Sequence, residues 1–196
     1  MTRYARASMA AGLMIAAAVA CSSTPTRFYT LSALATADST PTLVSVAVGR
    51  VRLPGVVDTT RVVVGTGANE VRLSDFDRWA SPLPEGIAQA VASDLATILG
   101  SPRVTLTSDA LGPDPDFRVA IEVQRFDSLL DDAAVLEAVW VVRRHSDGRV
   151  QVGRTSRREA AAGHGVSGLA AAHSRALASL SADIAAAIRA SDSPSP

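Results

Sequence analysis

The 196-residue sequence contains a single cysteine, Cys21, and no lysine, and only 4% of its residues are aromatic. One cysteine cannot form a disulfide within the chain, so the fold must depend on a core built mainly from aliphatic side chains. The 19 basic residues are all arginine, and 19 acidic residues match them. The sequence therefore lacks the basic excess that is typical of nucleic-acid-binding proteins.

Recognisable catalytic and metal-binding motifs are also lacking. The sequence has neither G-x-S-x-G nor H-E-x-x-H. The carboxylate pairs Asp75/Asp77 and Asp131/Asp132 lie in predicted polar loops, where no neighbour would shift a pKa. No ligand-type residue stands at metal-binding spacing from any of the three histidines, which are His145, His164 and His173. The sequence thus predicts no enzyme, metal or cofactor, and His173 is interpreted as a core residue of the last helix.

No apolar run reaches the roughly 20 residues that a membrane-spanning helix needs. A shorter run at 9–20 follows Arg3 and Arg6 and ends in Ala18-Val19-Ala20 before Cys21, as in a bacterial lipoprotein signal. This pattern predicts a signal peptide over 1–20, lipid attachment at Cys21 and a lipidated tether over 21–26. An ordinary cleavage site after Ala20, or a free buried cysteine, is the alternative.

The remainder of the chain predicts one domain over residues 27–190. Two apolar stripes of helical period predict amphipathic helices over 82–99 and 166–190, and Gly100 is a stop signal after the first. Short apolar segments, several of them alternating, predict strands over 27–31, 43–53, 61–64, 69–73, 103–107, 117–124, 133–145 and 149–159.

Turns rich in glycine join neighbouring strands into hairpins. Gly65-Thr66-Gly67-Ala68 lacks the third glycine and the following helix of a phosphate-binding loop, so it is interpreted as a hairpin turn. A two-residue turn at Asp147-Gly148 would set Glu137 opposite Arg158. The predicted fold class is α+β: a two-layer α/β sandwich, with a mostly antiparallel sheet and both helices on one face. Residues 191–196 predict a disordered tail.

Several segments form a more specific pattern. They are Arg27-Phe28-Tyr29-Thr30-Leu31, Arg50-Val51-Arg52-Leu53-Pro54, Asp58 with Arg61, Asn69-Glu70-Val71-Arg72-Leu73, Arg78-Trp79-Ala80-Ser81-Pro82-Leu83 and Val123-Gln124-Arg125-Phe126. Together they resemble the ABC-type transport auxiliary lipoproteins, which include the paraquat-inducible protein C lipoproteins of Gram-negative bacteria. The resemblance covers most of the mature chain, and it is most specific over 69–83. The sequence departs from the family pattern at Thr59-Thr60 and at Ser81.

The resemblance implies a non-enzymatic subunit anchored by lipid on the periplasmic face of the outer membrane. Such lipoproteins work with a mammalian-cell-entry (MCE) protein and an inner-membrane ABC transporter, comprising permease and ATPase, to move lipids between membranes. Ser22 stands where an acidic residue would retain a lipoprotein in the inner membrane of enteric bacteria, which favours the outer membrane. The oligomeric state, including a homo-oligomer, stays open.

Two other functions compete with this docking subunit. One is a periplasmic lipid-binding module whose helices and sheet enclose an acyl chain. The other is a periplasmic enzyme, which no group of residues in the sequence supports.

The pair Arg78 and Trp79 has two interpretations. In the first, Trp79 is a core residue under the start of the helix, and Arg78 bonds Asp75 or Asp77. In the second, the pair belongs to a surface that docks a partner, because Trp and Arg are common at interface hot spots. The first interpretation is favoured.

Overall fold

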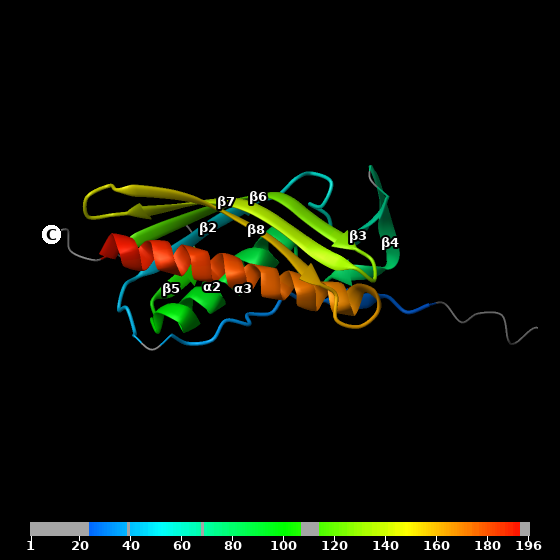
Figure 1. Cartoon of the computed structure of the whole chain (residues 1–196), viewed down its shortest axis with the longest axis horizontal. Helices are drawn as coiled ribbons and strands as arrows, with labels where there is room; N and C mark the ends of the chain where they lie inside the picture. The colour runs from blue at the N-terminus through cyan, green and yellow to red at the C-terminus, as the bar shows by residue number, and fades with distance from the viewer. Residues whose placement is uncertain (1–23, 39, 68, 107–113, 193–196) are drawn as a thin grey trace, which may run out of the picture.

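A curled sheet with two helices on one side makes up the domain in the computed structural model (Figure 1). The structure describes residues 24–38, 40–67, 69–106 and 114–192, so the predicted signal peptide and Cys21 lie outside the described residues. Over this described part of the chain the sheet has eight strands. They are β1 (Arg27–Tyr29), β2 (Val46–Arg52), β3 (Arg61–Gly67), β4 (Glu70–Trp79), β5 (Val104–Leu106), β6 (Phe117–Leu129), β7 (Ala133–Arg144) and β8 (Val150–Ala160).

The long strands β6, β7 and β8 form an antiparallel unit that agrees with the predicted strand order. Along β6, Val119, Ile121 and Val123 are buried while the residues between them are exposed, so one face of the sheet carries the core. The turn between β7 and β8 is longer than the predicted two residues. As a result Glu137 lies opposite Ser156, and the predicted pairing with Arg158 is wrong by two residues.

On its other side β6 has two partners, and here the sheet forks. Its first half pairs in parallel with β2, whose outer neighbour is β5. Its last residue, Leu129, pairs in parallel with Gly65 of β3, which leads through β4 to β1 at the edge. We refer to β2–β5 and β3–β4–β1 as the two branches of the sheet.

The predicted two-layer sandwich with a mostly antiparallel sheet therefore differs from the structure in two respects: the sheet is mixed, and it is curled into a half-barrel. Four parallel pairings join segments that are far apart in the chain, namely β1 with β4, β2 with β5, β2 with β6 and β3 with β6. Alternating hydrophobicity marks a half-buried strand but not the direction of its neighbour. The α+β class and the two helices are confirmed.

Helices α2 (Leu83–Leu99) and α3 (Gly165–Asp192) cover the concave face and pack against each other. α2 lies over the β2–β5 branch and α3 over β7 and β8 (Figure 1). Gly100 ends α2 in the left-handed conformation with φ of 62°, as its position in the sequence predicts. α3 continues to Asp192, two residues into the segment predicted as a tail.

A strap formed by residues 30–38 and 40–45 lies between β1 and β2 in the chain and runs along the outside of the two helices (Figure 1). Asp94 of α2 accepts hydrogen bonds of 2.8 Å from the backbone N–H groups of Leu34 and Ala35. Burial raises the pKa of Asp94, against the effect of these bonds. At the far end of the strap, Arg189 of α3 binds Asp38. The strap is thus fastened to both helices, so β1 is tied to the core as well as to β4.

Candidate functional site

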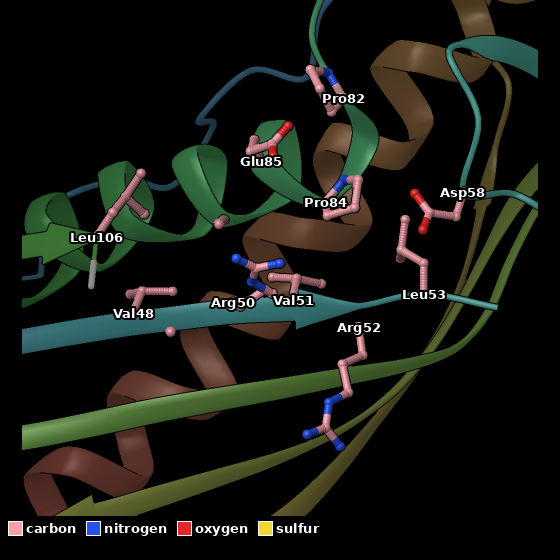
Figure 2. A pocket seen from close by; sticks show the side chains of 12 residues that line it. Val48, Arg50, Val51, Arg52, Leu53, Asp58, Pro82, Pro84, Glu85 and Leu106 are labelled. Atoms are coloured by element: carbon pink, nitrogen blue, oxygen red, sulfur yellow. The ribbon is translucent and has the colours of Figure 1, made fainter. Parts of the chain in front are cut away.

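A cleft of about 640 Å³ opens at the fork, between β2 and the first turn of α2 (Figure 2). Of the family-like segments, its lining includes residues 50–53, Asp58 and, from 78–83, only Pro82. Val48, Val51 and Leu53 form an apolar side, and Pro82 and Pro84 form the opposite wall.

A bulge in β2 aims Arg50 into the cleft. Val48 pairs with Val119 and Val51 with Ile121, so β2 has one more residue than β6 between these pairs. An extra residue breaks the strict alternation of side chains along a strand. Figure 2 shows the consequence: Arg50 and Val51 both lie on the side of α2, while Arg52 points to the other side.

Besides Arg52, which points to the other side of β2, three charged side chains that line the cleft have no partner within the described residues. Arg50, Asp58 and Glu85 are exposed, and within the described part of the chain none of them forms a side-chain hydrogen bond or ion pair. Elsewhere on the surface, opposite charges are mostly paired: Glu137, for example, binds both Arg125 and Arg154. The cleft therefore offers charges of both signs beside an apolar surface, which suits a polar partner that also buries apolar atoms.

The sequence-predicted pair Arg78 and Trp79 lies on strand β4, although residues 75–81 were expected to form a loop. Trp79 is 6% exposed on the concave side and meets Phe126 edge-on at 6.2 Å between ring centroids, so its predicted place in the core is confirmed. The predicted bond from Arg78 is wrong, because the two carboxylates have other partners. Arg61 binds Asp75 at 2.8 Å, and Asp77 faces the opposite side of β4.

Asp77 instead fastens the edge strand β1. It accepts hydrogen bonds from Arg27 at 3.0 Å, Tyr29 at 2.9 Å and Ser74 at 2.6 Å. Burial acts to raise the pKa of Asp77, but the hydrogen bonds from Ser74, Tyr29 and Arg27 outweigh it and hold the pKa below its usual value. The carboxylate is therefore ionised at neutral pH and links β1 to β4.

A serine–histidine pair lies in the core beneath Trp79. His173 Nε2 is 2.9 Å from Ser128 Oγ, and the imidazole stacks on Phe126 at 3.7 Å. Burial lowers the pKa of His173 to about 3, so the ring is neutral at physiological pH. Both side chains are sealed from solvent, which keeps any substrate away. The interpretation of His173 as a core residue is confirmed.

The other candidate chemistry of the sequence is structural. Asp132 pairs with Arg158, and Asp131 accepts a hydrogen bond from the backbone N–H of Gly165. Among the residues that the structure describes, no three side chains of the metal-binding types gather into a site. Within the same residues, no helix is long and apolar enough to cross a membrane. Cys21, the predicted lipid attachment site, lies outside the described residues.

Sequence reasoning quoted Arg50 and Asp58 as family-like residues but did not single them out, and it missed Glu85. One signal was available in the sequence. Apolar residues alternate up to Val48, and arginine then takes the next such position, at 50, and is repeated at 52. The bulge that turns Arg50 toward the helix has no such signal, because it depends on the parallel pairing with β6.

An α+β half-barrel with an open, charged cleft between its sheet and a helix is typical of a protein that binds another molecule at its surface. The sequence matches the ABC-type transport auxiliary lipoprotein component family over residues 29–185. The chain therefore belongs to the ABC-type transport auxiliary lipoprotein family, which is a family of transport components and not a class of enzymes.

Two solved structures share the fold over most of the chain. An uncharacterized protein is 22% identical with a TM-score of 0.68, covering 84% of this chain and 99% of its own. Protein XCC0632 from Xanthomonas campestris, of the DUF330 family, is 19% identical with a TM-score of 0.63. The match covers 81% of this chain and 92% of XCC0632. A PelC dodecamer from Paraburkholderia phytofirmans gives a TM-score of only 0.41 at 16% identity. That match covers 75% of this chain and 91% of the PelC chain. No curated protein matches the sequence.

Proposed function

We propose that this protein is the non-enzymatic, lipid-anchored subunit of an ABC transport system of the MCE type, and that it docks the inter-membrane complex at the outer membrane to assist lipid transport. The observation that carries the proposal is the family match over residues 29–185. The lipoprotein signal before Cys21 supports the anchor, and Ser22 supports the outer membrane.

The cleft between β2 and α2 is the docking site for the MCE protein or the permease in this proposal. Arg50, Asp58 and Glu85 supply charges that need no internal bond to be broken before they pair with a partner. Charges placed in this way favour specificity and rapid association. The apolar side at Val51 and Leu53 supplies the surface whose burial stabilises the complex.

Charge reversal at Arg50 tests the docking site. We expect Arg50→Glu to reduce co-purification of the MCE protein and permease from detergent-solubilised envelopes at least about tenfold, because breaking a close interfacial charge pair costs about 2 kcal/mol or more. Arg143→Glu is the matched control, since Arg143 is also exposed on a strand and has no side-chain partner within the described residues. Equal recovery with both variants would remove the cleft from the proposal.

The anchor has its own test. Cys21→Ala should leave a folded domain that no longer fractionates with membranes, because stable anchoring needs more than one acyl chain. Recovery of this variant in the outer-membrane fraction at the wild-type level would contradict anchoring by lipid.

A lipid-binding module is the second candidate, and one observation favours it. The apolar side chains of Val48, Val51 and Leu106 line the cleft next to the guanidinium of Arg50, an arrangement that also suits an acyl chain with a phosphate headgroup. Lipid in an organic extract of the purified protein, lost in Arg50→Glu, would support this function in place of docking.

A further inference from the structure

An exposed aromatic patch lies on the outer face of the β3–β4–β1 branch. Phe28 of β1 is 64% exposed and Phe76 of β4 is 43% exposed. Phe28 lies opposite Arg78 in the parallel pairing, and Phe76 precedes Arg78 by two residues on the same strand. Phe76 and Arg78 flank the buried Asp77 in β4, and Phe28 is the direct partner of Arg78, so the three side chains lie on the outer side of these strands. We call Phe28, Phe76 and Arg78 the edge patch.

The exposure of these rings is unusual for this chain. The sequence has four phenylalanines, and the other two, Phe117 and Phe126, are buried in the core. A chain with so few aromatic residues thus leaves two of them in solvent on adjacent strands. Apolar side chains grouped on a surface mark sites of interaction. The side chain of Arg78 forms no hydrogen bond or ion pair with any described residue, so its charge is available to a ligand.

The edge patch lies next to the predicted anchor. β1 begins at Arg27, and the five residues 22–26 that separate it from Cys21 span at most roughly 17 Å when extended. The chain enters the domain at the end where β3 and β4 lie, while the C-terminus lies at the opposite end of the long axis (Figure 1). The bonds of Asp77 to Arg27 and Tyr29 hold β1 firmly on β4. A bilayer that holds Cys21 is therefore within reach of Phe28 without any rearrangement of the fold.

We propose that the edge patch is a membrane-contact surface, in which Phe28 and Phe76 enter the headgroup region of the bilayer that holds Cys21 and Arg78 binds lipid phosphate. The inference rests on the proposed lipidation of Cys21. Phenylalanine is among the apolar residues that surface-bound segments bury at the boundary of headgroups and acyl chains, and such burial combined with attraction to anionic lipids gives surface binding. The contact would add to the acyl anchor and orient the domain, so that the end with the β7–β8 turn points away from the membrane.

A tryptophan placed in the edge patch reports this contact. The full lipidated protein carrying Phe28→Trp is reconstituted into vesicles of phosphatidylethanolamine and phosphatidylglycerol, with and without brominated acyl chains that quench indole. Val152→Trp is the matched control, because Val152 is also 64% exposed but lies on β8 near the opposite end of the molecule. The native Trp79 and Trp140 are buried, and the wild type in the same vesicles supplies their background.

We expect brominated lipid to quench the introduced indole of Phe28→Trp at least about twofold more than that of Val152→Trp. The emission of Phe28→Trp should also shift to the blue only in vesicles, as for a ring at a membrane interface. Phe76→Trp, with Val150→Trp as its control, should repeat the result. Equal quenching of Phe28→Trp and Val152→Trp would overturn the proposal. A blue shift of Phe28→Trp without quenching would also overturn it, because that result indicates a protein surface, such as a second copy, over the patch.

Flotation of the same vesicles separates the two levels of the proposal. If the wild type and both variants fail to float, the lipid anchor itself is absent and the proposed function fails. If all of them float but the indole of Phe28→Trp is not quenched, the anchor stands and the edge patch does not contact the bilayer.

Discussion

Arg78 and Trp79 are neighbours on β4, yet they belong to opposite faces of the sheet with different roles. On the concave face, Trp79 packs beneath the helices beside Phe126. On the outer face, Arg78 has no side-chain partner among the described residues, and Phe28 opposite it is exposed. In β2 the bulge brings both kinds of side chain to the side of α2, where Val51 is buried while Arg50 extends into the cleft. Buried side chains between the sheet and the helices therefore provide stability, while side chains without an internal partner, on the outer face at Arg78 and in the cleft at Arg50, are available for partners.

Trp79→Ala tests the contribution of the concave face to stability and has the largest expected effect. Removing the indole leaves a cavity beside Phe126, so we expect the free energy of unfolding to fall by about 3–5 kcal/mol. Chemical denaturation measures the loss, and Phe28→Ala on the outer face is the control with little change. A wild-type unfolding curve for Trp79→Ala would mean that the indole contributes nothing to the core and that the interface interpretation of this residue is right.

Leu180→Ala tests whether α3 belongs to the same core. Leu180 of α3 is fully buried, so we expect the free energy of unfolding to fall by about 2–5 kcal/mol in the same measurement. Leu130→Ala, on an exposed leucine, should change stability by no more than about 0.5 kcal/mol. A loss below about 0.5 kcal/mol for Leu180→Ala would show that the stripe of α3 is not core.

Asp77→Ala should loosen the edge strand β1 in a pH-dependent way. We expect it to cost about 1.5–3 kcal/mol at pH 7, because it removes hydrogen bonds to a charged carboxylate. The pKa of Asp77 is lowered in the folded state, so this stability is present above the ordinary value of 3.8 and is lost as the pH falls through the lowered pKa. Denaturation of the wild type and Asp77→Ala at a series of pH values from 7 down to acid measures this difference in stability. A difference that stays constant throughout would contradict the role of the ionised carboxylate.

Gly153→Ala tests the close packing of Trp140 against β8. A Cβ atom at Gly153 would collide with the ring of Trp140, whose indole N–H donates to Thr155. The ring must shift, so we expect a loss of about 1–3 kcal/mol and a changed near-ultraviolet circular dichroism signal. Gly55→Ala is the control, because nothing lies within 4 Å of a Cβ there. Identical melting of the two variants would contradict the close packing of Trp140.

Arg78→Ala has the smallest expected effect on stability. Its side chain forms no bond with the described residues, so we expect a change of no more than about 0.5 kcal/mol in unfolding. A loss above about 1 kcal/mol, measured beside Trp79→Ala, would mean that the outer face at β4 is part of the folded core.

The sequence predicted the individual elements well because each depends on local spacing. The helix predicted over 82–99 is α2 at Leu83–Leu99, and the strand predicted over 117–124 begins β6. It did not predict residues 75–79 as part of β4. Those residues are extended because β1, some 50 residues earlier, pairs with Asp77, Arg78 and Trp79. Such a pairing over a long connection leaves no local pattern.

The cleft could be predicted only in part for the same reason. The family-like segments around Arg50 and Arg78 indicated where specific residues gather in the chain. Their arrangement required the fork, at which β2 and β3 pair with different parts of β6, and the bulge that turns Arg50 toward α2. Both are consequences of parallel pairing. The burial of Trp79, in contrast, followed from the residue type alone and is confirmed.

Site-specific photo-crosslinking in the cleft tests whether this lipoprotein docks a transport complex through the space between β2 and α2. A photoreactive residue at Leu106, an exposed lining residue on β5, is activated in living cells, with Val152 as the control position. The account predicts an adduct from position 106 that mass spectrometry identifies as the MCE protein or the ABC permease, and none from position 152. An adduct with lipid alone, or equal adducts from both positions, would contradict it.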